Sequence, residues 1–234
     1  MNIIIRTALF LCLLLTASCN KVYTWHQKLT VTVQTPTGEV SGYSVTQITK
    51  THSDSWYAPP EARGVRSDVR GEAVVVEVAP GKYLFVLLDG VESLAYHTFT
   101  QFPYTRGSEF DRWARSIERH RGSAEVPQDA YPMMVAFADI DDPASVVLVD
   151  PEKLASTYGE GYSLAEVTLE ITDEEVTTGV VETMLYWWME KRSGSYNEMS
   201  PLRLSNNSPR GWENLSARSF WSVDLLQKFS ERAQ

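Results

Sequence analysis

The amino-acid sequence predicts an α+β fold that is rich in β-strand, with antiparallel hairpins in its N-terminal half and a few helices. Two observations carry this prediction. Segments 29–34 and 163–173 alternate apolar and polar residues at period two, as half-buried strands do. Segments 108–122 and 219–234 instead place their large apolar residues at helical spacing. Short strands joined by proline- and glycine-rich turns favour a small sandwich or half-barrel.

The first predicted hairpin joins LTVTVQ (29–34) to EVSGYSVTQIT (39–49). The residues between them, TPTG (35–38), are typical of a turn, and we expect a loop longer than two residues. Residues 50–71 are less regular, since the paired prolines Pro59 and Pro60 exclude helix and central strand.

The second predicted hairpin joins AVVVEV (73–78) to YLFVLL (83–88), with Pro80 and Gly81 in its turn. Its return strand is apolar on both faces. One face would carry Leu84, Val86 and Leu88, and the other Tyr83, Phe85 and Leu87. We therefore expect this strand to be central in its sheet or covered on both sides.

An amphipathic helix is predicted over 108–122, with Ser108 as its N-cap and Gly122 as its C-terminal stop. Two acids, Asp111 and Glu118, share a flank of this helix with three arginines. An exposed, salt-bridged face explains this better than a phosphate or glycan site. The arginines are Arg112, Arg115 and Arg119.

The second half of the chain mixes both patterns. YPMMVAFADI (131–140) predicts a buried strand and PEKLASTYG (151–159) a short helix, followed by the alternating strand at 163–173. Segment 174–191 is ambiguous, because its tail permits a helix whereas Thr177, Thr178 and Gly179 favour an irregular start. The end of the chain, 219–234, predicts a helix.

The first eighteen residues have the pattern of a secretory signal. Arg6 precedes an apolar run that extends from Ala8 to Leu15 and ends in small residues. This run is much shorter than the ~20 apolar residues that span a bilayer. We divide the chain into a signal peptide (1–18), a β-rich region (19–105) and an α+β region (106–234), of which the last two can form one continuous domain.

The small residues directly before Cys19 resemble a bacterial lipobox. In that family of signals the cysteine becomes the first mature residue and its sulfur carries a diacylglyceryl group. The usual leucine three places before the cysteine is here Thr16, with Leu15 one place further back. The resemblance implies an envelope lipoprotein, anchored to a membrane through Cys19 and facing the periplasm. The alternative is plain cleavage near Ala17 or Ser18, which would release a soluble periplasmic or secreted protein.

Cysteine usage supports lipidation. Cys12 lies in the segment to be removed, so the mature chain keeps Cys19 alone and forms no internal disulfide. A lone thiol is a liability in an oxidising compartment, and acylation would remove it. Each buried methylene contributes ~0.8 kcal/mol, so two or three acyl chains hold a protein durably on a membrane.

The negative charge of the chain is concentrated in one stretch. Residues 139–182 hold 12 acidic residues and only Lys153, while the chain without its first eighteen residues has a formal charge of −10. Nucleic acid and anionic lipid headgroups are therefore poor partners. Divalent cations or a basic protein face suit the stretch better, and a solvated acidic surface is the simplest explanation.

The candidate metal ligands are Asp139, Asp141 and Asp142. Calcium takes several hard oxygen ligands, and Asp139 and Asp141 would share one side of an extended chain. The EF-hand spacing and its glycine are absent, and Asp142 before Pro143 also fits a simple turn. We expect no cofactor, with calcium as the alternative.

No catalytic residue is assigned. The mature chain, from Cys19 on, has no GxSxG elbow, no SxxK and no HExxH motif. His97 is the first candidate for a general base in a site assembled from distant residues, but a partly buried structural histidine explains it more simply. The aromatic cluster Tyr186, Trp187 and Trp188 would be a binding face for a glycan or a partner if exposed. We favour a core role for it.

Several ordered words resemble a recurring segment of uncharacterised proteobacterial exported proteins. They are F-x-D-I-x-D-P-x-S-V (137–146), VDPEKLA (149–155), YGEGY (158–162) and LEITDEEVTTG (169–179), together with PPEARGVRSDVRGEAVVV (59–76) and GKYLF (81–85). The resemblance covers most of the mature chain and implies no catalytic role. It implies that 131–190 is one structural unit and not a linker.

Two functional hypotheses from different classes follow. The first is a non-enzymatic binding or structural module of the cell envelope, whose partners are the membrane, through the N-terminal lipid, and another envelope protein or a glycan. The second is a periplasmic hydrolase that acts on glycan or peptide through unidentified residues. A deep cleft with converging carboxylates or a buried serine–histidine contact would favour the hydrolase, and a flat apolar groove or an open sheet edge the binding module.

Overall fold

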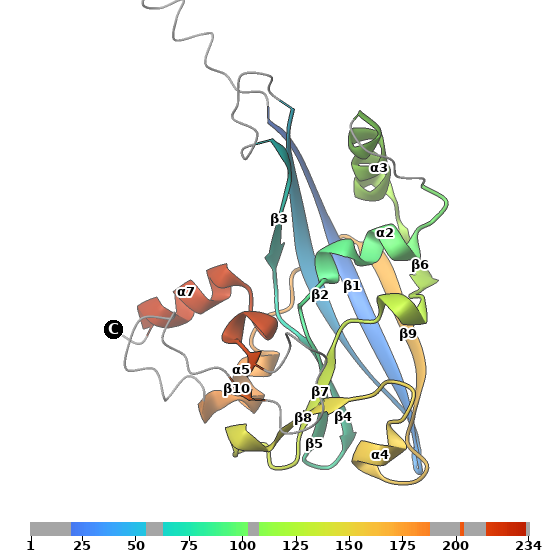
Figure 1. Ribbon diagram of the computed structural model, residues 1–234, viewed down its shortest axis with the longest axis vertical. Coiled ribbons are helices and arrows are strands. Elements are labelled where there is room, and N and C mark those ends of the chain that lie inside the picture. Colours follow the sequence, from blue (N-terminus) through green and yellow to red (C-terminus); the bar gives the residue numbers. More distant parts are fainter. Residues whose placement is uncertain (1–19, 55–62, 103–107, 188–201, 204–213, 233–234) are drawn as a thin grey trace, which may run out of the picture.

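The computed structural model describes residues 20–54, 63–102, 108–187, 202–203 and 214–232. Within these ranges the protein has the predicted β-rich α+β fold, with two antiparallel sheets that face each other and a few short helices (Figure 1). A third pairing joins the short strands β10 (Leu202–Arg203) and β11 (Asn214–Leu215). None of the described helices is both long and apolar enough to cross a bilayer.

A long hairpin organises the larger sheet. Strand β1 (Lys21–Thr35) pairs with β2 (Gly38–Ser53) from Lys21 opposite His52 to Thr35 opposite Gly38. Only Pro36 and Thr37 lie between the last pair, so the expected longer loop was wrong. The side chain of Thr35 closes this tight turn, because its hydroxyl donates to the Gly38 carbonyl at 2.7 Å.

The larger sheet has the order β3-β2-β1-β9-β6. Its outer members are β3 (Gly64–Arg70), β9 (Ser163–Thr172) and β6 (Gly122–Glu125), of which β9 confirms the strand predicted at 163–173. The irregular segment expected over 50–71 is in part strand, since β2 continues to Ser53 and β3 pairs with it. Strand β3 is mostly exposed, so it carries no apolar alternation that would predict it. Pro59 and Pro60 lie outside the described residues.

The smaller sheet has the order β4-β5-β7-β8. Its second strand, β5, is internal and buried on both faces, as its sequence predicted. Leu84 and Val86 join one hydrophobic core, and Phe85 joins the other. The strands of this sheet are β4 (Val74–Ala79), β5 (Lys82–Val86), β7 (Met134–Phe137) and β8 (Val146–Val149).

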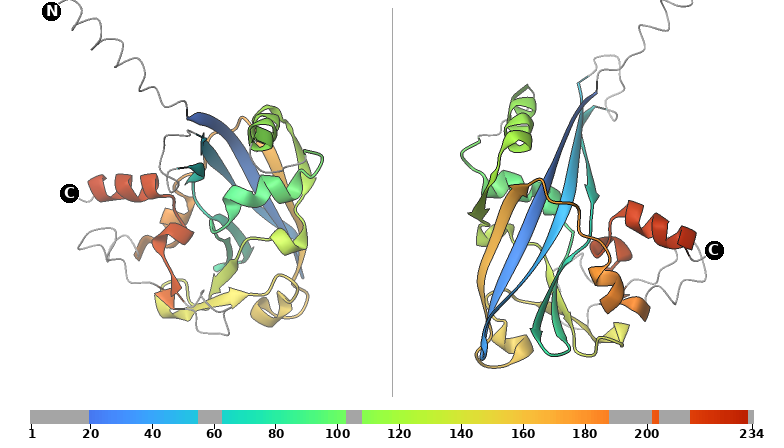
Figure 2. Two further views of the ribbon diagram at one scale, coloured as in Figure 1. Left: turned by 45° about the horizontal axis from the view of Figure 1, so that its top comes forward. Right: turned by 180° about the vertical axis from the view of Figure 1, so that it is seen from behind.

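Both sheets combine strands from both halves of the chain. Strand β9 pairs with β1, with Leu29 opposite Leu169, and β7 pairs with β5, with Phe85 opposite Val135. A boundary at residues 105 and 106 therefore does not separate two sheets. The view from behind in Figure 2 shows β9 beside β1, although most of the chain lies between them in sequence.

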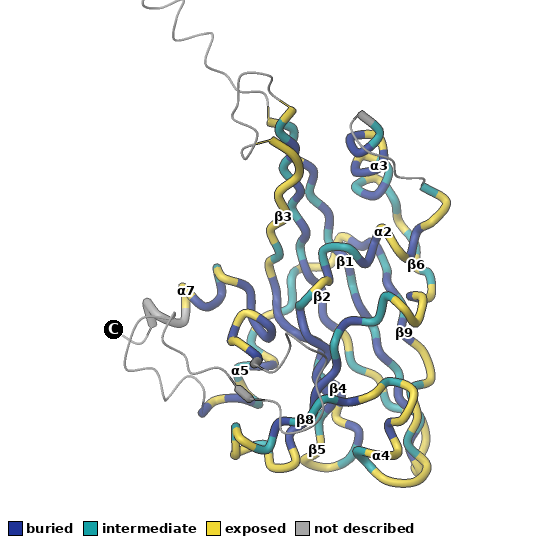
Figure 3. The backbone as a smooth tube through the Cα atoms, in the orientation of Figure 1, coloured by how far each residue is buried: buried dark blue, intermediate teal, exposed yellow. Residues whose placement is uncertain are grey.

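Two hydrophobic cores lie on opposite faces of the smaller sheet. The first fills the space between the two sheets and reaches under α3, with Val31, Leu84 and Val167 among its members. The second lies between the smaller sheet and the C-terminal elements, with Phe85 and Trp221 among its members. The tube in Figure 3 shows buried positions along the inner strands and exposed ones at the turns.

The two sheets approach each other closely at Gly42 of β2. A Cβ atom at this position would lie 2.1 Å from the carbonyl oxygen of Val75 in β4, which is inside any permitted contact. Glycine is required here because a neighbouring backbone occupies the space of a side chain.

The helices pack on both sheets, some on edge strands and one on the middle strand of the larger sheet. The predicted amphipathic helix is α3 (Ser108–Arg119), which packs on β1, but Gly122 opens β6 instead of ending the helix. The side chain of Ser108 is not described, so its predicted capping role stays a prediction. Helices expected within 151–159 and 219–234 are present as the shorter α4 and α7. Helix α4 spans Ala155–Tyr158 and α7 spans Val223–Arg232. The other short helical segments are η2 (Val91–Ser93), α2 (Leu94–Thr98), η3 (Gln128–Ala130), η4 (Pro143–Ser145), α5 (Val180–Met184) and η6 (Ala217–Ser219).

Candidate functional site

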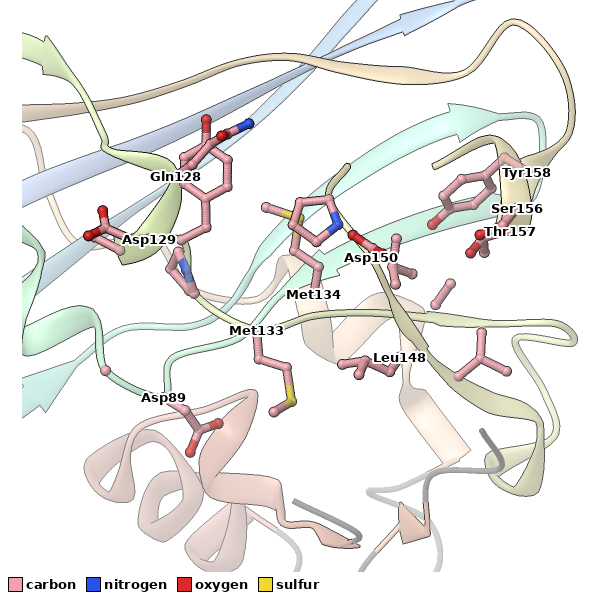
Figure 4. A pocket seen from close by; sticks show the side chains of 18 of the residues that line it. Asp89, Gln128, Asp129, Met133, Met134, Leu148, Asp150, Ser156, Thr157 and Tyr158 are labelled. Carbon is pink, nitrogen blue, oxygen red and sulfur yellow. The ribbon is translucent and has the colours of Figure 1, made fainter. Parts of the chain in front are cut away.

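A large cleft lies beside β7 and β8, between the loop after β5 and helix α4. Its volume is about 1210 Å³, which is above the ~300–1,000 Å³ range of typical ligand pockets. In Figure 4, Asp89 and Asp129 lie on one side of the cleft and Tyr158 lies on the other. Met133 and Leu148 lie between them. The cleft thus joins an acidic wall to an apolar base.

Local turns place the polar side chains of the cleft. After β5 the chain reverses at Gly90, whose φ of 84° is available to glycine at little cost, and enters η2. Asp89 immediately precedes this reversal. Pro127 precedes η3, which carries Asp129, and Asp150 follows β8, where its carboxylate accepts a hydrogen bond from the Glu152 nitrogen at 3.0 Å.

Asp89 carries an unsatisfied acceptor. Its Oδ2 atom is buried and receives no hydrogen bond from the described residues. A buried polar atom without a partner costs ~1–3 kcal/mol, and this oxygen is shielded from solvent and therefore also from a ligand in the cleft.

The charge balance of the cleft is negative. Three carboxylates line it, those of Asp89, Asp129 and Asp150. The basic side chains in the lining are those of Lys82 and the exposed His97. Asp150 also pairs with Lys153 at 3.4 Å, at the exposed rim. The cleft therefore suits a ligand that brings positive charge or hydrogen-bond donors.

Two tyrosines keep their protons in this environment. Burial raises the pKa of Tyr158, whose hydroxyl donates to the carbonyl of Tyr83 at 3.0 Å. Burial also raises the pKa of Tyr131, and the nearby Glu125 and Glu166 carboxylates add to the effect. Both phenols therefore act as neutral groups and not as bases.

The histidines do not form a nucleophile–base pair within the described part of the chain. His97 is exposed at the rim of the cleft and contacts the Tyr96 ring at 4.9 Å, without a hydrogen bond to serine or aspartate. His26 bonds the Glu174 carbonyl, and His52 bonds the Asp111 carboxylate. The structure thus brings His97 to the cleft but gives it no catalytic partner.

The predicted calcium ligands have other roles. Asp139 accepts a hydrogen bond from the Asp141 nitrogen at 3.0 Å, and Asp142 accepts one from the Ala144 nitrogen at 2.9 Å. No three histidine, cysteine or acidic side chains gather as metal ligands in the ranges that the structure describes. The alternative of an Asp-Pro turn before Pro143 accounts for these carboxylates, and the calcium hypothesis has no geometric support.

The aromatic cluster divides between core and surface. Trp187 is only 6% exposed, packs on Phe137 and donates its indole N–H to the Ile140 carbonyl at 2.7 Å. Tyr186 is 48% exposed and donates to Asp141 at 3.2 Å. Trp188 lies outside the described residues. The favoured core role therefore fits Trp187, whereas a continuous aromatic binding face does not form from these two.

The sequence prediction was wrong for the position of Asp111 and made none for Glu72. Asp111 was expected on an exposed face beside arginines, but it is buried between Lys21 and His52, at 2.7 Å from each. Glu72 attracted no attention, yet it is fully buried beneath α5. No local pattern predicts either position, because their partners lie far away in the chain.

The anchor residue Cys19 lies outside the described residues, and strand β1 begins two residues later at Lys21. Comparisons with protein-family models, curated proteins and solved structures find no match to this chain. The similarity to exported proteins and the lipid anchor therefore stay predictions, and any function rests on the cleft and the charge layout.

Proposed function

We propose that this protein is a membrane-anchored lipoprotein of the bacterial envelope and a non-enzymatic binding module whose ligand enters the cleft beside β7 and β8. The observation that carries the proposal is a large cleft lined by three carboxylates, Asp89, Asp129 and Asp150, and by one lysine, Lys82. The leader and Cys19 supply the envelope location.

The ligand is best matched by a basic segment of another envelope protein. Such a segment offers donors to Asp89 and Asp129 and places the apolar stems of its side chains against Met133 and Leu148. A neutral glycan offers donors but no charge to balance the carboxylates, so it fits less well.

A periplasmic hydrolase is the second candidate. It is favoured by the carboxylates that share one cleft, as paired acids do in glycoside cleavage. It is disfavoured because His97, on the rim, has no hydrogen-bonded acid or serine among the described residues.

The binding proposal is tested by in vivo photocrosslinking in the envelope. A photoreactive residue is placed at Met133, and the crosslinked partner is compared between the parent and the Asp89→Asn/Asp129→Asn variant. We expect a specific protein adduct that the double variant loses. A matched control removes two exposed acids elsewhere, Asp68→Asn and Glu160→Asn, and should keep the adduct.

Two outcomes would overturn the binding proposal. An adduct that survives the Asp89→Asn/Asp129→Asn change would show that the cleft carboxylates do not recognise the partner. Cleavage of peptidoglycan or peptide by the purified protein, abolished by the same change, would favour the hydrolase. The anchor is tested separately, since Cys19→Ala should abolish acyl labelling.

A further inference from the structure

The charges of the folded chain are segregated along its long axis. At one end lies the turn at Pro36, where Ser163 of β9 stands opposite Gln34 and Gly161 lies against Pro36. Figure 1 places α4 and β8 at this same end. The first part of the acidic stretch, 139–166, therefore lies at the end that is far from Lys21, where β1 begins, whereas β9 carries the later acids back toward the start of β1.

The opposite end carries an exposed stripe of arginines on α3. The three arginines are three and four residues apart, so they lie on one side of the helix. The other side is buried against β1, through Phe110, Trp113 and Ile117. The exposed residues of the stripe are Arg112, Arg115 and Arg119.

The acids that would neutralise this stripe point inward. Asp111 bonds Lys21 and His52, and Glu118 accepts a hydrogen bond from the Thr24 nitrogen at 2.9 Å. Within the described ranges, no ion pair joins either acid to the arginines of α3. Glu109, half-buried in the first turn, is the remaining carboxylate of the helix. The outward face of α3 is therefore net positive.

The same contacts tie α3 to the start of the chain. Asp111, next to Arg112, binds Lys21 at 2.7 Å, and Lys21 is two residues after Cys19. Two residues of extended chain span at most ~7 Å. This distance is shorter than the Debye length of ~8 Å at physiological ionic strength, so a lipid on Cys19 would hold this end within reach of headgroup charges.

We propose that the arginine stripe of α3 binds anionic lipid headgroups and thereby orients the folded protein with α3 toward the membrane. The proposed anchor is needed to bring this protein to a membrane. The attraction between the stripe and anionic headgroups does not depend on the anchor, because the stripe belongs to the folded protein itself. The expectation that anionic headgroups are poor partners holds for the acidic end alone. The same headgroups repel the acidic end.

The test measures vesicle binding without the lipid anchor. The mature chain with Cys19→Ser is sedimented with phosphatidylcholine vesicles that contain, or lack, about one third phosphatidylglycerol. We expect binding to the anionic vesicles only, and its loss between ~0.1 M and ~1 M salt. The variant Arg112→Gln/Arg119→Gln should bind on the order of 20-fold more weakly, since each basic residue near an anionic surface contributes roughly fivefold.

A charge-matched control separates the stripe from net charge. Lys153→Gln/Lys228→Gln removes two exposed lysines away from α3 and should change binding less than about twofold. Equal weakening by both variants, or binding to neutral vesicles alone, would overturn the proposal. Circular dichroism confirms that each variant is folded. Failed acyl labelling at Cys19 would refute the anchor and leave this result unaffected.

Discussion

The Oε1 atom of Glu72 lies 2.9 Å from the backbone nitrogen of Val180, which is 108 residues further along the chain. The nitrogens of Gly179 and Val181 donate to the other oxygen of the same carboxylate, at 3.1 Å and 3.3 Å. These are the free N–H groups of the first turn of α5, which a helix leaves unpaired. A single buried acid therefore fixes α5 to the start of the smaller sheet.

Glu72→Ala should destabilise the protein by ~1–3 kcal/mol, because the three backbone N–H groups at the start of α5 lose their acceptor. Urea unfolding followed by tryptophan fluorescence measures the change. Glu160→Gln, which alters an exposed acid, should cost less than ~0.5 kcal/mol. Equal effects at the two positions would contradict a structural role for the contact.

The pH dependence of the same contact has a definite sign. Burial raises the pKa of Glu72, and the hydrogen bonds from Val180, Val181 and Gly179 offset this only in part. The folded state therefore binds a proton more tightly than the unfolded state. The contribution of Glu72 to the free energy of unfolding is therefore fully present below the unfolded pKa of 4.5. It declines as the pH rises through the raised pKa of the folded state. The difference in unfolding free energy between the parent and Glu72→Ala should narrow as the pH rises over that window, and a widening difference would refute the assignment.

Asp111→Asn should cost ~2 kcal/mol at neutral pH, because it leaves the Lys21 ammonium without its counter-charge and the buried His52 ring without its carboxylate hydrogen-bond partner. Burial raises the pKa of Asp111, but the hydrogen bonds from Lys21 and His52 outweigh it and leave the pKa lowered. The contribution is therefore present above the unfolded pKa of 3.8 and is lost as the pH falls through the lowered one.

Denaturation at two pH values measures this effect. The difference in unfolding free energy between the parent and Asp111→Asn should disappear in strong acid and persist near neutral pH. Asp68→Asn, at an exposed position of β3, should leave the free energy of unfolding unchanged. A gap that persists below the lowered pKa would mean that packing, and not charge, is responsible.

Gly42→Ala should prevent close contact between the two sheets. Its Cβ would meet the Val75 carbonyl oxygen at 2.1 Å, so backbone must move, at a cost of ~2 kcal/mol or more. Thermal unfolding measures the loss. Ser41→Ala, one residue earlier and exposed, is the matched control and should be nearly neutral. An unaltered melting temperature for Gly42→Ala would disprove the close approach.

Two adjacent aromatic residues should lose very different amounts of stability on truncation. Trp187→Ala should lose ~3 kcal/mol or more, because it empties part of the second core and removes the bond to Ile140. Tyr186→Ala should lose less than ~1 kcal/mol, since its ring is about half exposed. Chemical denaturation of both variants decides the matter, and similar losses would contradict the described packing.

The elements that the sequence predicted are those with a local signature. The second hairpin is an example, because the alternation around Leu84 and Phe85 by itself predicts two opposite buried faces. Helix α3 is another, since Trp113 and Ile117 recur at helical spacing. Strand β3 was missed because its exposed residues carry no such pattern.

The site depended on contacts that no local window contains. Asp129 and Asp89 share a cleft because β7 pairs with β5, a pairing between distant segments. The inward direction of Asp111 depends on Lys21 and His52, which stand opposite each other on β1 and β2. Motif reasoning could name His97 as a base, but only the fold shows that it stands without a partner acid in the described region.

The position of β9 between β1 and β6 has a consequence for how the chain is made. Strand β1 leaves the ribosome early and acquires β2 almost at once, but its second edge has no neighbour until Ser163–Thr172 is synthesised. A nascent sheet with one long naked edge is prone to pair with other chains. A holding chaperone should therefore bind the newborn polypeptide until its closing strand emerges.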